Sequence, residues 1–146
     1  MEPVVAELGT SGAAVVLSPG WDGPSTANEL RAPTYSSYAV TNASPEHPLV
    51  GVSLRVERVI GLQEPFRRRW LNGQTTQGYH GLQGVGAAAV PLPGVGIELA
   101  GRGRGGAVAF VQTGTAYWAV HVSAPEATWR TRRAEVIGLM RALVLP

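Results

Sequence analysis

The stretch from Val95 to Leu145 places the strongest limits on how this chain can fold. Apolar residues recur at every second position over 95–99, which is the period of a strand with one buried side. A second apolar run covers 107–112, and the glycines at 103–106 can take the positive φ that a hairpin connection needs. A third run at 115–123 is apolar on both sides, so both of its faces should be covered. The stretch therefore predicts three consecutive strands.

An amphipathic helix is predicted after the third strand. Its N-terminus reads Ser123-Ala-Pro-Glu126, which has the form of a capping box: the Ser123 hydroxyl accepts from the first free amides, and Glu126 accepts from the Ser123 amide. A proline fits in this first turn because its missing N–H would be unpaired there. The apolar residues that follow Trp129 at helical spacing are Val136, Ile137, Met140, Leu143 and Val144. Because a lone hairpin or helix is marginal in water, the three strands and this helix form the expected stable nucleus.

The residues before 95 predict more strands and one short helix. The helix begins near Gln63, where Leu62, Phe66 and Trp70 lie four residues apart, and it ends at Asn72-Gly73. The small apolar residues at 84–90 favour an inner strand against which a helix sits closely. Apolar runs with turn signals predict further strands at 4–8, 13–17, 35–41 and 49–60, the first two as an opening hairpin.

Length and composition indicate a single domain over residues 1–146. A hydrophobic content of 45% argues against disorder, whereas 19 glycines and 11 prolines favour strands and turns over long helices. The fold class predicted is α+β, an antiparallel sheet covered by helices. There is no apolar run of about 20 residues, and Met1-Glu2-Pro3 does not open a signal peptide. We therefore expect a soluble, cytoplasmic protein.

The residue types that are missing remove several kinds of chemistry. With no cysteine there are no disulfides, thiolate metal sites or cysteine nucleophiles, and with no lysine there is no Schiff base or lysine-dependent phosphate loop. The three histidines, His47, His80 and His121, are far apart and lack the spacing of paired metal ligands. We expect no metal and no cofactor. The use of arginine alone is most simply the codon bias of a GC-rich genome.

Three segments resemble the PsbP-like superfamily, which includes extrinsic photosystem II subunits, a Ran-binding nuclear import factor, bacterial lipoproteins and type VI secretion adaptor chaperones. Ser18-Pro-Gly-Trp21 is similar to the family's P-x-W stop after an opening hairpin, and Leu62-Gln-Glu-Pro-Phe66 resembles its first helix. The segment from Gly114 to Pro125 and the helix end at Leu139–Leu143 resemble its closing strand and helix. The resemblance covers nearly the whole chain and implies a PsbP-like α/β/α sandwich. Members share a shape and not a chemistry, so it carries no functional residue across.

A catalytic role is a weak hypothesis for His121. The chain has one aspartate, Asp22, and no Gly-x-Ser-x-Gly elbow, so a hydrolase is the least favoured function. A histidine in a strand beside aromatic residues is more often a packed core or edge residue. The hydrolase hypothesis requires a pocket around His121, and packing of the ring against helix side chains would count against it.

Two arginine clusters are the candidate partner-binding residues. Arg102 and Arg104 lie in a glycine-rich turn, and Arg67, Arg68 and Arg69 precede Trp70. They could orient an acidic protein or grip phosphate. The simpler interpretation is a solvated hairpin tip and a helix face whose arginine stems cover a core tryptophan.

These observations favour a non-enzymatic protein-binding or assembly factor that meets its partner at a sheet edge, a helix face or a groove, with a homodimer as a further option. The alternative is a weak nucleic-acid-binding protein that uses the same arginines, although a net charge of +2 is low for that role. A steep salt dependence of binding would support the alternative.

Overall fold

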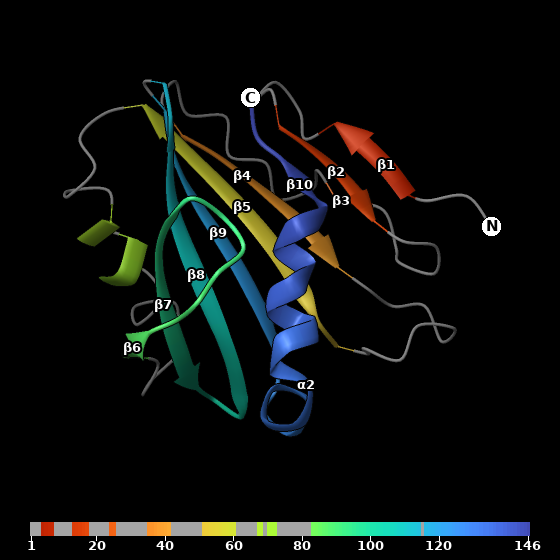
Figure 1. Ribbon diagram of the computed structural model, residues 1–146, viewed down its shortest axis with the longest axis vertical. Coiled ribbons are helices and arrows are strands. Elements are labelled where there is room, and N and C mark those ends of the chain that lie inside the picture. The colour runs from red at the N-terminus through yellow and green to blue at the C-terminus, as the bar shows by residue number, and fades with distance from the viewer. Residues whose placement is uncertain are drawn as a thin grey trace.

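The computed structural model describes residues 4–7, 13–17, 24–25, 35–41, 51–60, 67–68, 70–72, 83–114 and 116–146 (Figure 1). The strands are β1 (Val4–Glu7), β2 (Ala14–Leu17), β3 (Pro24–Ser25), β4 (Tyr35–Thr41), β5 (Ser53–Ile60), β6 (Gln83–Ala87), β7 (Gly94–Gly101), β8 (Arg104–Thr113), β9 (Ala116–Pro125) and β10 (Leu143–Val144). Helix α2 (Glu126–Gly138) continues into a 3-10 turn, η1 (Leu139–Ala142). Residues 67–68 and 70–72 are also helical.

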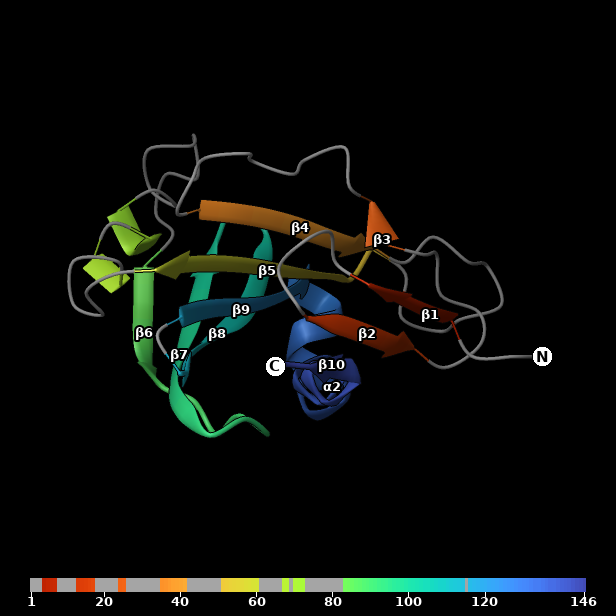
Figure 2. The ribbon, with the colours of Figure 1, turned by 90° about the horizontal axis from the view of Figure 1, so that it is seen from above.

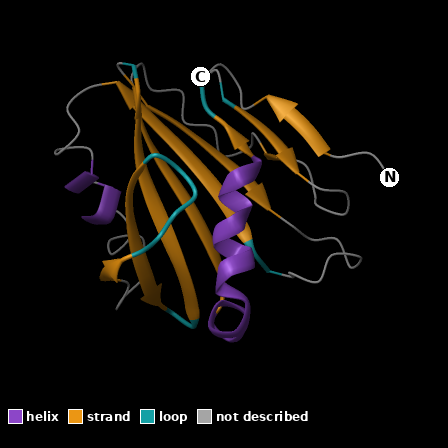
Figure 3. Cartoon of the chain, viewed as in Figure 1, coloured by secondary structure: helices purple, strands orange, loops and turns teal. Residues whose placement is uncertain are grey.

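Seven strands form one antiparallel sheet in the order β3-β4-β5-β9-β8-β7-β6. Its centre is β5-β9-β8, and the pairing of β8 with β9 runs from Arg104↔Pro125 to Thr113↔Ala116. The predicted α+β class with an antiparallel sheet is confirmed. The three strands and the helix predicted from 95–145 are β7, β8, β9 and α2, and they lie together in the structure (Figure 3).

A second, small sheet joins the two ends of the chain. The predicted opening hairpin is confirmed as β1 and β2, and β10 pairs with β2 through Leu143↔Val15 and Val144↔Ala14. Figure 2 shows this sheet beside α2, on the same side of the seven-stranded sheet. Val15 and Leu17 are buried in the same core as the α2 residues Val136 and Ile137. The C-terminal strand therefore fastens the first hairpin to the core.

The seven-stranded sheet has two different faces, which we call the helix face and the opposite face. The helix face is packed under α2 and consists of apolar side chains that alternate along β5, β8 and β9: Leu54, Val56, Ala107, Ala109, Val111, Trp118, Val120 and Val122. The opposite face carries a smaller apolar cluster: Trp70, Leu99, Val108, Phe110 and Ala119. Trp118 and Trp129 are buried, at 0% and 8% exposure.

Two local predictions are wrong. Residues 84–90 do not form an inner strand, because β6 is the last strand of the sheet among the described residues, where it pairs with β7 alone. The Ser123–Glu126 capping box does not form either: Ser123 still belongs to β9, and Pro125 is the N-cap without a side-chain hydrogen bond. The Ser123 hydroxyl instead contacts the Ser53 hydroxyl at 3.0 Å. The Glu126 amide donates to the Gly103 carbonyl at 2.8 Å. This first helical N–H is therefore satisfied by a residue distant in sequence and not by a local capping side chain.

Candidate functional site

The tip of the β7–β8 hairpin holds the start of helix α2. The tip is a two-residue turn in which Arg102 and Gly103 have φ values of 52° and 69°, the pattern of a type I′ turn that matches strand twist. The Gly103 carbonyl accepts from the first helical amide, as described above. Two residues after Gly103, a Cβ on Gly105 would come within 2.2 Å of the Trp129 ring. Only glycine therefore lets this ring approach β8 so closely. The glycine-rich turn thus positions α2 against the sheet edge.

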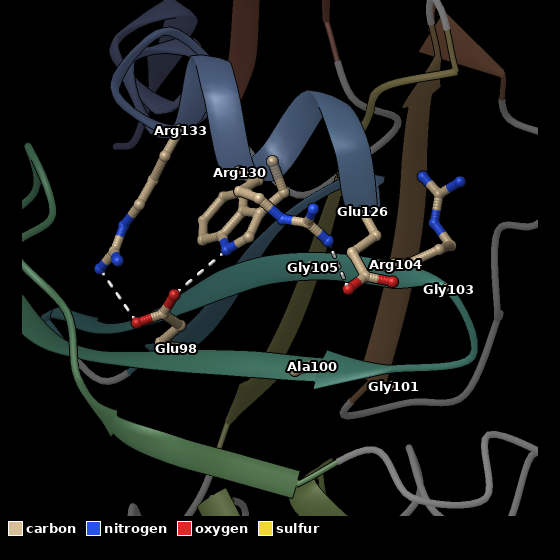
Figure 4. Close-up of a pocket in the computed structure, with 10 residues that line it drawn as sticks. Glu98, Ala100, Gly101, Gly103, Arg104, Gly105, Glu126, Arg130 and Arg133 are labelled. Carbon is tan, nitrogen blue, oxygen red and sulfur yellow. Dashed lines mark hydrogen bonds and ion pairs between the residues drawn. The ribbon is translucent and has the colours of Figure 1, made fainter.

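A pocket of about 500 Å³ lies between the hairpin and the first half of α2 (Figure 4). Glu98 on β7 accepts hydrogen bonds from Trp129 Nε1 at 3.1 Å and pairs with Arg133 Nη2 at 3.0 Å. The Arg133 guanidinium also lies 5.5 Å from the centroid of the Trp129 ring. Glu126 and Arg130, which pair at 2.9 Å, border the same pocket.

A second pocket of about 530 Å³ continues along the same side of α2. One wall is the segment Ala89–Pro91 between β6 and β7, and the other is the second half of α2 with Ile137, followed by Arg141 of η1. Arg133 lines both pockets. We call the two pockets together the α2 groove.

The α2 groove is bordered by more positive than negative side chains. Arg104, Arg130, Arg133 and Arg141 line it, whereas its acidic residues are Glu98 and Glu126. Both acids are already paired with arginines of the helix. Arg141 is exposed and has no acidic partner among the described residues. The groove therefore combines apolar walls with a positive rim, which suits an acidic ligand.

The side chains of the predicted residues Arg102 and Arg104 have different surroundings. Arg102 is exposed at the tip of the turn. Arg104 donates through Nη2 to the Gly51 carbonyl at 2.7 Å and to the Ser123 hydroxyl at 3.0 Å, so its guanidinium ties the hairpin to β9 and to the start of β5. Figure 4 shows this side chain extending away from Glu98. Its first task is structural.

The other predicted cluster lies over a distant part of the opposite face. The Arg67 guanidinium lies 5.4 Å from the centroid of the Phe110 ring, Arg68 is exposed, and Arg69 lies outside the described residues. Phe110 is six residues from Arg104 along β8, which corresponds to roughly 20 Å. The ring of Trp70 meets both Phe110 and His121 edge-on on this face. Arg67 and Arg104 therefore lie at different places on the same face of the sheet.

Sequence reasoning missed the arginines of α2 as a site. At the level of sequence these arginines fit the polar side of an amphipathic helix. In the structure, Arg130 and Arg133 lie on either side of a break in helical geometry at Arg132, and Arg141 lies in η1, yet all three line the groove. The spacing of positions 130, 133, 137 and 141 was the available signal. What these positions face, namely Glu98 and the 89–91 segment, depends on strand pairing that the helix sequence does not contain.

His121 lies on the opposite face and packs against an aromatic ring. Its imidazole meets Trp70 edge-on, with ring centroids 5.3 Å apart and an interplanar angle of 80°. Burial, followed by the positive charges of Arg55 and Arg104, lowers the pKa of His121 to about 4. The ring is packed against a helical residue, the arrangement that counts against the hydrolase hypothesis. No group of metal-ligating side chains occurs within the described part of the chain.

No protein-family model matches this chain, and no curated protein matches it by sequence. Solved structures do match in three dimensions. The cyanobacterial PsbP protein of Synechocystis sp. PCC 6803 aligns with a TM-score of 0.64 at 11% identity, over 99% of this chain and 93% of that protein. The Ran-binding protein Mog1p of Saccharomyces cerevisiae aligns with a TM-score of 0.55 at 14% identity, over 99% of this chain and 96% of that protein. At these identities the similarity establishes the fold, and the predicted PsbP-like architecture is confirmed. No helix in the described ranges is long and apolar enough to cross a membrane.

Proposed function

We propose that this chain, which has the PsbP/Mog1-like fold, is a non-enzymatic binding protein that docks an acidic, extended segment of a partner protein in the α2 groove. The observation that carries the proposal is the continuity of two pockets along one side of α2, joined at Arg133 and bordered by arginines. A segment with alternating acidic and apolar side chains matches this combination of rim and walls.

The second pocket supplies the apolar part of the binding energy. Val90, Pro91 and Ile137 line it, and burial of an apolar partner side chain there is favourable by about 25 cal/mol for each Å² removed from water. Each pocket has the size of sites that hold a small ligand or a few side chains. A short extended segment of a partner would therefore fit the groove.

Arg141 supplies the first electrostatic contact. Because it is exposed and has no acidic partner among the described residues, a partner carboxylate can approach it without breaking an existing ion pair. Arg130 and Arg133 are engaged with Glu126 and Glu98, so an acidic ligand has to exchange with these pairs. We expect Arg141 to govern the rate of capture and Arg133 to govern specificity.

The fold neighbours give limited support to protein binding. The yeast neighbour is a Ran-binding protein, and it shares the fold of this chain at 14% identity. One protein with this fold therefore binds another protein. The function proposed here rests on the groove itself.

Nucleic-acid binding by the two arginine clusters is the less favoured function. The Arg67 guanidinium lies over the Phe110 ring, and the Arg104 guanidinium donates to Gly51 and Ser123, which leaves fewer free donors to follow a long phosphate backbone. The five arginines at 67–69, 102 and 104 nevertheless stay a second docking candidate for an acidic protein. The two locations predict different mutant behaviour.

The test compares two single charge reversals with the same change in net charge. Arg141→Glu alters the α2 groove, and Arg68→Glu alters an equally exposed arginine on the opposite side of the sheet. Nuclease-treated lysate is passed over each tagged variant, and the amount of any partner captured by the unmodified protein is measured. We expect Arg141→Glu to lower capture at least about tenfold and Arg68→Glu to leave it unchanged.

The opposite ranking would move the site to the clusters predicted from the sequence. Equal loss in both variants would indicate a net-charge effect and contradict a groove. If nuclease removes everything that the unmodified protein captures, the protein-binding function is wrong and the nucleic-acid alternative replaces it. Circular dichroism melting of both variants confirms that the comparison is made between folded proteins.

A further inference from the structure

A polar cluster interrupts the apolar part of the opposite face where β5, β9 and β8 meet. Arg55 on β5 lies directly across from His121 on β9 in the strand register. The next pair along the same strands is Ser53 with Ser123, whose hydroxyl oxygens are 3.0 Å apart. Arg104 reaches the cluster from β8 and donates to the Ser123 hydroxyl. All five side chains are partly buried, so they lie at the surface of the sheet and not inside the core.

The position of the His121 ring follows from a glycine. A Cβ on Gly106 would lie 3.3 Å from His121 Nε2, so this nitrogen sits above β8, two residues from Arg104. The other side of the ring meets Trp70. The indole N–H of Trp70 is buried and has no hydrogen-bond partner among the described residues. A buried N–H without a hydrogen-bond partner lowers the stability of the folded state, and a bound ligand with an acceptor oxygen would remove this loss.

Donors outnumber acceptors in this cluster, and its charge is positive. Two guanidinium groups flank the imidazole, and no ion pair joins Arg55 to an acid among the described residues. The acidic residue on the same side of β5 is Glu57, which is 6% exposed and already has an interaction of its own. His121 stays neutral at pH 7 because its pKa lies at about 4. Within the described ranges the cluster therefore has no negative partner.

We propose that Arg55, Arg104 and His121 form a binding site for an oxyanion, a carboxylate or phosphate group, on the opposite face of the sheet. Guanidinium groups bind both kinds of oxyanion through charge-assisted hydrogen bonds. The Ser53–Ser123 pair supplies one further hydroxyl donor, because only one of the two hydroxyl hydrogens is used between them. The site shares Arg104 with the rim of the α2 groove but lies on the other face of the sheet, and it does not depend on the function proposed for the groove.

Binding of an anion is coupled to the protonation of His121. A negative charge beside the imidazole favours its protonated form, so the anion raises the pKa of His121 above its value in the free protein. By thermodynamic reciprocity, protonation of His121 strengthens anion binding by the same factor. The charges that act on the imidazole are those of Arg55 and Arg104, and the Trp70 ring is neutral packing. Glu57 lies on the same side of β5 across from Ala119, and Arg67, from the helical segment that carries Trp70, lies over Phe110.

The test is a titration of the ¹⁵N-labelled full chain with sodium sulfate, observed by NMR at the His121 ring nitrogens and at constant ionic strength. Sulfate is the tetrahedral probe because its charge does not change in the range from about pH 4 to 8. We expect a saturable shift of the His121 signals and a rise in the pKa of His121. Acetate at neutral pH is the carboxylate probe, and the probe that binds more tightly identifies the class of ligand.

The decisive variant is Arg55→Gln, because Arg55 lies directly across from His121, whereas Arg104 also ties the hairpin to β9. We expect it to weaken sulfate binding by about tenfold or more, whereas Arg55→Lys retains part of the affinity. Arg68→Gln, which removes one charge elsewhere on the protein, is the matched control and should bind as the unmodified chain does. If neither probe shifts the His121 signals saturably, or if Arg55→Gln binds as well as Arg68→Gln, the proposed site does not exist.

Discussion

The two faces of the seven-stranded sheet differ in what their side chains are for. On the helix face, Leu54, Val56, Trp118, Val120 and Val122 are all at 0% exposure and pack under α2 and η1. On the opposite face, an apolar cluster around Trp70 and Phe110 gives way to a patch of arginine, histidine and serine. We infer that apolar packing on the helix face contributes most of the free energy of unfolding. The polar side chains on the opposite face contribute less to it, because they bury less apolar surface.

Truncation of one tryptophan on each face tests this contrast and has the largest expected effect. Trp118 is fully buried and donates through Nε1 to the Thr113 hydroxyl at 2.6 Å, so Trp118→Ala should lower the free energy of unfolding by about 3–5 kcal/mol. Trp70→Ala removes a ring whose N–H has no partner in the described part of the chain, so its cost should be smaller, about 2–3 kcal/mol. Urea unfolding of both variants measures the difference. Equal costs would contradict the assignment of stability to the helix face.

The pH dependence of stability probes the opposite face. The unfolded state takes up a proton at His121 near pH 6.5, whereas the folded state, with a pKa of about 4, does not. Between these values the unfolded state binds more protons, so the free energy of unfolding falls as the pH is lowered from about 6.5 to 4, by an amount on the order of 3 kcal/mol. His121→Gln should lose less stability over this range. Parallel curves for the two proteins would show that His121 does not contribute.

Glu98 should show a smaller effect, at the edge of the helix face. Its carboxylate accepts from Trp129 Nε1 and pairs with Arg133, so Glu98→Ala leaves a mostly buried indole N–H without its acceptor. The expected loss is about 1–2 kcal/mol. Glu126→Gln, which weakens an exposed i,i+4 pair, is the comparison variant and should cost about 0.5 kcal/mol or less. Thermal unfolding of the two variants ranks them, and a larger loss for Glu126→Gln would contradict the structural role given to Glu98.

Periodic patterns in the sequence were sufficient to predict most of the strands and the helix that the structure describes. The strand expected at 35–41 is β4, and the run expected at 115–123 is β9, whose Trp118, Val120 and Val122 lie in the core under α2. These features are local, because one strand's own residues decide which side is apolar. The long strand expected at 49–60 begins later, at Ser53, since Gly51 has a φ of 78° and ends the extended backbone there.

The features that escaped prediction depend on contacts between distant segments. The amide of Glu126 is satisfied by Gly103, 23 residues earlier, and not by the capping box beside it. The position of β6 at the sheet edge follows from strand order, which the small apolar residues at 84–90 do not encode. The α2 groove likewise depends on the approach of 89–91 to Arg133 and Arg141. Arg69 lies outside the described residues, so its proposed part in partner binding stays a prediction.

The groove as the docking site is tested most directly by photo-crosslinking from two positions on one helix. Ala134 is exposed and lines the groove, whereas Ala127 is an exposed alanine of the same helix that lines neither of its pockets. A photoreactive phenylalanine analogue is placed at each position, and the crosslinked peptides are identified by mass spectrometry. Docking in the α2 groove predicts crosslinks from position 134 to an acidic segment of a partner, and few crosslinks from position 127. Equal crosslinking from both positions, or crosslinks from 127 alone, would contradict it.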